Sequence, residues 1–148
     1  MIIQCCILNT RLGVLTKNKN ILIISQYFWP ENFKINDLAS HFSEKNYKID
    51  VLTGIPNYPT GKYFQGYGIF QKVSEVKEGI SIYRVPIIPR MKASPLQLGL
   101  NYISFVFFGF FRLLKFKGHF DKVFIYAPSP ITVGFLGIVA AKKFKCKS

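Results

Sequence analysis

The sequence has few cysteines and few histidines. Its three cysteines, Cys5, Cys6 and Cys146, are odd in number and show no Cys-x-x-Cys spacing, so neither a disulfide framework nor a zinc site is predicted. We therefore expect a reducing, cytoplasmic compartment. The two histidines, His41 and His119, have no partner at metal-ligand spacing, and no metal site is expected.

Several motifs of common enzyme classes are also missing. No Gly-x-Gly-x-x-Gly follows the first predicted strand, which disfavours a nicotinamide or flavin enzyme and weakens the alternative of a small nucleotide-binding Rossmann protein. No Gly-x-x-x-x-Gly-Lys-[Ser/Thr] is present, which excludes a P-loop NTPase. No Ser-His-Asp arrangement or spaced carboxylate pair can be argued. The sequence thus predicts no cofactor and identifies no catalytic residue.

Acidic residues are scarce and unevenly distributed. Seven Asp/Glu stand against 20 Lys/Arg, a formal net charge of +13. Residues 1–78 contain nine Lys/Arg and six Asp/Glu, whereas residues 79–148 contain eleven Lys/Arg and only Asp121. Such a field attracts anionic lipid or phosphate-bearing substrates. Nucleic acid is disfavoured, because the basic residues alternate with apolar runs and no zinc-finger, RRM or basic-zipper pattern appears.

Predicted strands and helices alternate along most of the chain. The order strand, helix, strand, loop, strand, helix, strand, helix predicts an α/β fold, a Rossmann-like doubly wound parallel sheet. Residues 1–19 show no period and are expected to be a poorly ordered extension of a domain spanning 20–148, with an extra edge strand at Ile2 to Leu8 as the alternative. The predicted strands are 20–26, 48–54, 80–88 and 122–126, the helices are 32–46, 95–117 and 131–144, and 55–79 is a long functional loop.

Residues 93–111 form a 19-residue stretch without a charge, long enough for a membrane span to be considered. Polar residues interrupt the stretch and basic residues follow it, which favours a buried or interfacial helix over the span. Amphipathic helices with aromatic and basic residues lie in the headgroup region of a membrane. The residues expected to contact an anionic membrane are Phe107, Phe111, Arg112, Lys115 and Lys117.

Ligands of open parallel sheets bind beyond the carboxyl ends of the strands. Tyr27 and Glu31 follow the first predicted strand, where aromatic faces beside a carboxylate suit a sugar ring or an isoprenoid tail. After the second strand, Asn57 and Tyr58 are candidates for hydroxyl groups and Lys62 for a phosphate. The alternatives remain open: Glu31 as a first-turn acid that favours the helix dipole, and the second loop as turn chemistry alone.

Ser129 and Thr132 follow the fourth predicted strand and precede a helix. Backbone N–H groups at such a helix start can bind an anion. An ordinary capped helix explains the same residues equally well.

Four ordered blocks carry a resemblance to a known family. Together they resemble the amino-terminal domain of family 4 glycosyltransferases of the WbuB or WcaI type, over residues 20 to about 147. The blocks span residues 20–39, 51–62, 83–90 and 126–134.

The resemblance implies the GT-B fold, in which an acceptor domain faces a donor domain across a cleft. It implies metal-independent transfer, with retention, of a sugar from a nucleotide sugar to a polyprenyl-linked acceptor during lipopolysaccharide, capsule or exopolysaccharide synthesis. Tyr27, Glu31, Asn57, Tyr58 and Lys62 would face that cleft, and the protein would lie on the inner face of the cytoplasmic membrane.

The chain ends before the family's donor domain, so the resemblance implies a fragment that is inactive by itself. A different class remains as the alternative: a non-catalytic, membrane-peripheral Rossmann-like binding module that uses the basic helix 95–117.

Overall fold

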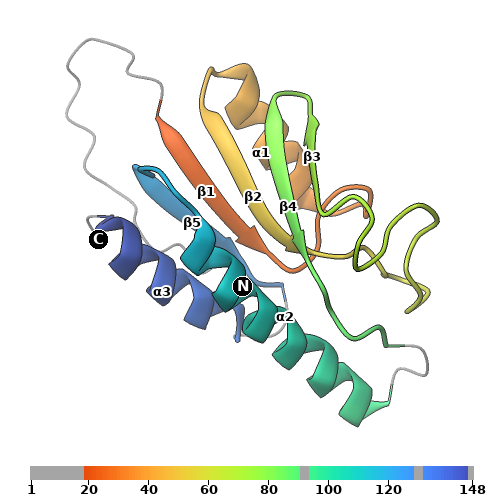
Figure 1. The fold of residues 1–148 in the computed structure, drawn as a ribbon. Coiled ribbons are helices and arrows are strands. Elements are labelled where there is room, and N and C mark those ends of the chain that lie inside the picture. Colours follow the sequence, from red (N-terminus) through yellow and green to blue (C-terminus); the bar gives the residue numbers. More distant parts are fainter. Residues whose placement is uncertain (1–18, 91–93, 129–131, 147–148) are drawn as a thin grey trace.

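A computed structural model describes residues 19–90, 94–128 and 132–146. The predicted extension therefore lies outside the described residues except for Lys19. The described residues form five strands and three helices (Figure 1): β1 Asn20–Ser25, α1 Lys34–Glu44, β2 Lys48–Gly54, β3 Ser74–Lys77, β4 Ile80–Val85, α2 Pro95–Lys115, β5 Lys122–Tyr126 and α3 Val133–Phe144.

The sheet has the strand order β3-β4-β2-β1-β5. β4, β2, β1 and β5 are parallel, which confirms the predicted α/β fold and gives it a partly Rossmann-like sheet. β3 is antiparallel to β4, so the expectation of a purely parallel sheet is wrong. The predicted loop 55–79 conceals this edge strand. A two-residue turn joins the pair, with φ of 51° at Glu78 and 76° at Gly79, the backbone that tight hairpins require.

Alternating residues on each strand face opposite sides of the sheet. Leu22 and Ile24 of β1 pack with α2 and α3, whereas Ile21 and Ile23 pack with α1. Both faces are therefore covered, with α1 on one side and α2 and α3 on the other (Figure 1). This explains why the central strands are apolar on both faces.

Two glycines let α3 approach its neighbours. A Cβ on Gly137 would lie 1.8 Å from Ile125 Cδ1 of β5, and one on Gly109 of α2 would lie 2.8 Å from Leu136 Cδ1 of α3. The carboxyl ends of α2 and α3 also meet. Lys143 Nζ donates to the carbonyls of Leu113, Leu114 and Phe116 at 2.6 to 2.9 Å, which satisfies acceptors left free where α2 ends.

α2 is long and apolar enough to cross a membrane by length and composition. In this fold it lies against the sheet and α3, with Asn101, Ser104, Phe105, Gly109 and Leu113 buried. The structure thus shows α2 as a layer of the α/β fold.

Candidate functional site

The loops after β1, β2 and β4 meet at the carboxyl edge of the sheet. The Gly54 N–H and the Thr53 hydroxyl donate to the Gln26 carbonyl at 3.1 and 3.3 Å. The Ile55 N–H donates to the Val85 carbonyl at 3.1 Å. These bonds hold the first residues of the three loops together, so side chains far apart in the sequence share one edge.

Glu31 connects the first loop to the second. Its side chain is buried, with 3% of its surface exposed. Oε1 accepts hydrogen bonds from the Asn57 N–H at 2.8 Å and the Tyr58 N–H at 2.7 Å. Burial raises the pKa of Glu31 to about 7, although the backbone N–H groups of Tyr58, Asn57 and Phe28 and the charge of Arg90 lower it. Glu31 therefore positions the loop that carries Asn57 and Tyr58.

Three aromatic rings cluster above this carboxylate. Tyr27 stacks on Phe33 with ring centroids 5.0 Å apart, and Tyr58 contacts Tyr27 at 5.9 Å and Phe33 at 5.4 Å. Tyr27 is buried, and this burial raises its pKa to about 12, so its phenol stays neutral. Tyr58 is 43% exposed and offers a ring to solvent.

Arg90 completes the cluster from the loop after β4. Its guanidinium carbon lies 5.0 Å from the centroid of Tyr58 and 5.9 Å from that of Tyr27, within cation–π range. Sequence reasoning did not identify Arg90 as a ligand residue. The signal was available, because Arg90 follows the third predicted strand, on the same edge as the other two loops. Tyr27, Glu31, Asn57, Tyr58 and Arg90 are called the carboxyl-edge site below.

A buried hydrogen-bond chain supports this site from α2. Gln26 Nε2 donates to Asn101 Oδ1 at 2.6 Å, and Asn101 Nδ2 donates to the Ile88 carbonyl at 2.6 Å. Gln26 Oε1 and Asn57 Oδ1 are buried and have no hydrogen-bond partner among the described residues. Asn57 Nδ2 donates to the Ile55 carbonyl at 3.1 Å. Two buried acceptor oxygens thus remain, one on Asn57 within the site and one on Gln26 next to Tyr27 in the chain.

The other sequence-predicted residues lie elsewhere or are differently placed. Lys62 is exposed on the second loop, just beyond the turn that the Gly61 N–H closes onto the Asn57 carbonyl at 2.7 Å. Thr132 is exposed at the start of α3 and its side chain makes no capping hydrogen bond. Ser129 lies outside the described residues. Among the residues that the structure describes, no group of three metal-ligating side chains occurs.

The residues predicted to contact a membrane lie along α2, except for Lys117, which follows the helix. Phe107, Phe111, Lys115 and Lys117 are exposed, Phe107 by 55%, and Arg112 is half-buried. Phe107 and Phe111 belong to a larger apolar ridge, which borders a groove of about 520 Å³ between α2 and α3. The apolar ridge comprises the exposed side chains of Leu96, Leu100, Ile103, Phe107, Phe111 and Leu114 on α2 and Phe135 and Ile138 on α3.

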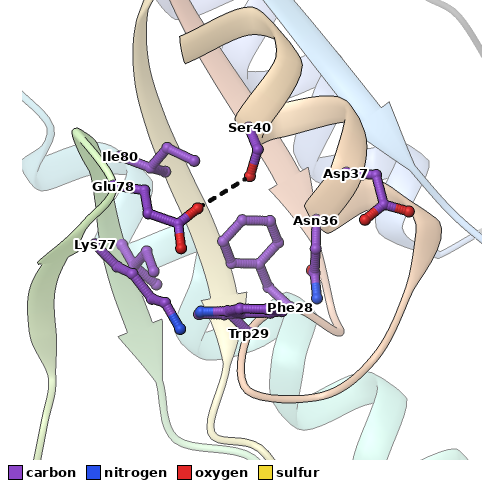
Figure 2. A pocket seen from close by; sticks show the side chains of 9 residues that line it. Phe28, Trp29, Asn36, Asp37, Ser40, Lys77, Glu78 and Ile80 are labelled. Carbon is purple, nitrogen blue, oxygen red and sulfur yellow. Dashed lines mark hydrogen bonds between the residues drawn. The ribbon is translucent and has the colours of Figure 1, made fainter. Parts of the chain in front are cut away.

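A small cavity lies on the opposite side of the sheet, between α1 and the β3–β4 hairpin. Figure 2 shows Trp29 and Asn36 directed into it, with Lys77 over the Trp29 ring at 3.8 Å and Ser40 donating to Glu78. Trp29 Nε1 and Asn36 Oδ1 are buried and have no partner among the described residues. The volume of about 40 Å³ holds a few water molecules but no sugar ring.

Comparison with known proteins identifies no family for this chain. No protein-family model matches the sequence, and no curated protein matches it. Function is therefore inferred from the α/β fold and from the geometry of the carboxyl-edge site.

Proposed function

We propose that this chain is the acceptor-side half of a GT-B-type glycosyltransferase. In this proposal the enzyme transfers a sugar from a nucleotide sugar, with retention and without a metal, to a polyprenyl-linked acceptor in bacterial surface polysaccharide synthesis. The carboxyl-edge site binds the acceptor, and a second domain facing the same edge binds the donor. No residue of the described chain is assigned as catalytic.

One observation carries the proposal: the Arg90 guanidinium lies against the exposed ring of Tyr58 at the carboxyl edge, and Asn57 is the residue before Tyr58. An exposed aromatic ring beside polar side chains is suited to a sugar ring. An Arg guanidinium suits a phosphate, because its planar fork donates two parallel hydrogen bonds. A polyprenyl-linked saccharide presents a sugar and a phosphate next to each other, and the site offers a partner for each.

The site is also held rigidly, which acceptor positioning requires. Glu31 fixes the second loop through two backbone N–H groups, and Asn101 on α2 fixes the first and third loops. A positioning site built on supported loops loses less freedom when the ligand binds. This favours the buried carboxylate as a support for the loop, and the exposed Tyr58 and the half-buried Arg90 as the acceptor contacts.

We also propose that the protein works on the cytoplasmic face of a membrane, where a polyprenyl carrier is held. The apolar ridge and the basic second half of the chain support that placement. The same features favour the second candidate, a membrane-peripheral binding module without catalysis. The two candidates differ at the carboxyl-edge site, because only the first requires it to bind a glycan.

The test is a titration of the isotope-labelled chain with a water-soluble, short-chain prenyl diphosphate that carries one sugar. We expect the backbone N–H resonances of Asn57, Tyr58 and Arg90 to shift in a saturable way. Arg90→Gln should weaken binding about tenfold, the effect of losing one charge-assisted hydrogen bond. Asp37→Asn, a substitution on the exposed side of α1, is the matched control and should leave binding unchanged.

Two results would reject the acceptor role. The first is an absence of shifts at the carboxyl edge at any ligand concentration reached. The second is equal binding by wild type and Arg90→Gln with the shifts gathered on another surface. Vesicle binding together with either result would leave the non-catalytic membrane module as the better description.

A further inference from the structure

A basic pocket lies at the carboxyl end of α2, away from the carboxyl-edge site. Its volume is about 210 Å³, and it is lined by Asp50, Tyr83, Arg112, Lys115, Phe116 and Lys117. Drug-sized ligands occupy cavities of about 300–1,000 Å³, so this pocket suits a smaller polar group. Three cationic side chains and one carboxylate give it both signs of charge.

Sheet and helix contribute opposite charges to the basic pocket. Asp50 on β2 and Tyr83 on β4 belong to the sheet. They line the pocket together with the last residues of α2, which ends at Lys115. The ring of Phe116 packs edge-on against Tyr83 at 4.8 Å, and the Arg112 guanidinium lies 5.4 Å from the Tyr83 centroid. Arg112 is therefore held over the pocket floor, while Lys115 and Lys117 are exposed at its rim.

Within the described part of the chain, the Asp50 carboxylate has no counter-charge at contact distance. Its Oδ1 is buried without a hydrogen-bond partner among the described residues, and no basic side chain forms a salt bridge with it there. Burial raises the pKa of Asp50, while the charge of Lys48 and a hydrogen bond with Ser81 lower it. An anion alone would meet this carboxylate with repulsion, whereas a ligand that also carries an ammonium group would satisfy it.

The basic pocket borders the apolar ridge on the same helix. Phe111 and Lys115 are four residues apart and therefore lie one turn apart on one face of α2. Arg112 follows Phe111, and Lys115 follows Leu114, the last ridge residue on α2, so the cations lie at the carboxyl end of the ridge. Amphipathic helices with this arrangement lie at the headgroup level of a membrane, with the apolar side chains toward the acyl chains.

We propose that the basic pocket binds the phosphoethanolamine headgroup of a membrane lipid while the apolar ridge lies among the acyl chains. Arg112, Lys115 and Lys117 contact the phosphate, and Asp50 receives the ammonium. This proposal rests on the proposed function, which places the protein on a membrane surface. It adds the lipid headgroup that the protein would bind there. The basic pocket is complementary in charge to a lipid surface. It is not complementary to a second copy of the chain, because the basic side chains of two facing copies would repel each other.

The experiment is flotation of the full chain with phosphatidylcholine vesicles that contain a fixed minor fraction of phosphatidylglycerol, with and without phosphatidylethanolamine. We expect wild type to bind about twofold to fivefold more tightly when phosphatidylethanolamine is present, the range of one partly exposed ion pair. Asp50→Asn should lose that preference and keep its binding to vesicles without phosphatidylethanolamine. Asp37→Asn makes the same charge change on the α1 side and should behave as wild type.

Asp50→Asn distinguishes binding in the basic pocket from attraction by the overall charge. The two predict changes of opposite sign in the affinity for vesicles that contain phosphatidylethanolamine. Removing a negative charge from a basic protein should strengthen binding to all anionic vesicles equally, if only the overall field matters. Arg112→Gln combined with Lys115→Gln should weaken binding to both vesicle types by about tenfold or more. Urea unfolding of each variant checks that these effects do not arise from loss of the fold.

An unchanged ethanolamine preference in Asp50→Asn, or no preference in wild type, would overturn the pocket and leave the membrane placement standing. No flotation with either vesicle type would overturn the pocket and the placement together. A dimer that Phe107→Ser dissociates would show that the ridge joins two copies, which also rejects the proposal. The acceptor role is decided separately by the prenyl diphosphate titration.

Discussion

The two helical layers that cover the sheet differ in how many large apolar side chains they expose. On one side, α1 buries Ile35 and Ala39 and exposes none of its large apolar side chains. On the other side, α2 and α3 bury Phe105, Leu113 and Leu136 but leave the apolar ridge exposed. The same sheet thus carries one layer that meets water and one that presents more apolar surface than covering the sheet requires.

On the α1 side of the sheet, buried polar side chains hydrogen-bond to the neighbouring loop and to β3. Arg84, on the strand face of Ile82, donates to the Trp29 carbonyl at 2.8 Å and to Glu75 Oε1 at 2.5 Å, and so joins the first loop to β3. Asn36 donates to the Glu31 carbonyl at 2.6 Å. Stability therefore depends on both layers, whereas only α2 and α3, among the helices, expose large apolar side chains.

The largest expected effect compares two phenylalanines on α2. Phe105 is fully buried and Phe107 is exposed. Phe105→Ala should lower the free energy of unfolding by about 3–5 kcal/mol, because it leaves a cavity in the core. Phe107→Ala should change it by no more than about 0.5 kcal/mol. Urea unfolding measures both, and a similar loss in the two variants would show that the ridge is covered in solution.

Arg84→Met tests the buried hydrogen bonds that Arg84 makes on the α1 side of the sheet. The substitution removes a buried cation and leaves Glu75 and the Trp29 carbonyl without their donor, so we expect a loss of about 3–4 kcal/mol in the free energy of unfolding. Arg112→Met removes an arginine from the α2 side, where it has no salt bridge among the described residues, and serves as the control. Equal stability of Arg84→Met and wild type would contradict the account.

Glu31→Gln tests the buried carboxylate through pH. The folded-state pKa of Glu31, about 7, exceeds the ordinary value of 4.5. The folded protein thus holds this proton more tightly than the unfolded chain, and the contribution to stability is lost as pH rises through 7. Gln still accepts from both N–H groups but cannot ionise. Its stability advantage over wild type should therefore grow by about 3 kcal/mol between pH about 4.5 and about 8.

Urea unfolding across that pH range measures the difference between wild type and Glu31→Gln. Glu44→Gln, at the exposed end of α1, controls for the change in net charge. If the difference in free energy of unfolding between wild type and Glu31→Gln stays constant with pH, burial does not stabilise the protonated, neutral form of the Glu31 carboxyl group.

The smallest effect compares two glycines on α3. Gly137→Ala should lower the free energy of unfolding by about 1–2 kcal/mol, since its Cβ would overlap Ile125 Cδ1. Gly134→Ala meets nothing within 4 Å and should be neutral or raise stability by up to about 1 kcal/mol through helix propensity. Thermal unfolding of the pair, with opposite signs expected, checks whether α3 packs as closely on β5 as described.

Much of the fold could be predicted because its signals are local. β2 and β5 have the predicted bounds, since short β-branched or aromatic runs begin and end abruptly there. α2 ends two residues earlier than predicted, where Lys143 satisfies its carbonyls. β3 could not be predicted, because Ser74–Lys77 contains a single apolar residue and is a strand only through pairing with β4.

The candidate site was predictable in position but not in detail. Parallel strands bring their carboxyl ends to one edge, so Tyr27, Asn57 and Tyr58 could be grouped from sequence. That Glu31 turns inward depends on the positions of two backbone N–H groups in another loop, which no local pattern encodes. The cation–π placement of Arg90 depends likewise on the course of the loop after β4.

The most direct test of the central claim is photo-crosslinking with a short-chain prenyl diphosphate whose attached sugar carries a diazirine. We expect crosslinked peptides to map to the carboxyl-edge site, at residues 27–33, 57–62 and 86–90, and unlabelled ligand to compete. Crosslinks confined to the α1 side of the sheet, or a pattern that Arg90→Gln leaves unchanged, would contradict the assignment of this edge to a sugar acceptor.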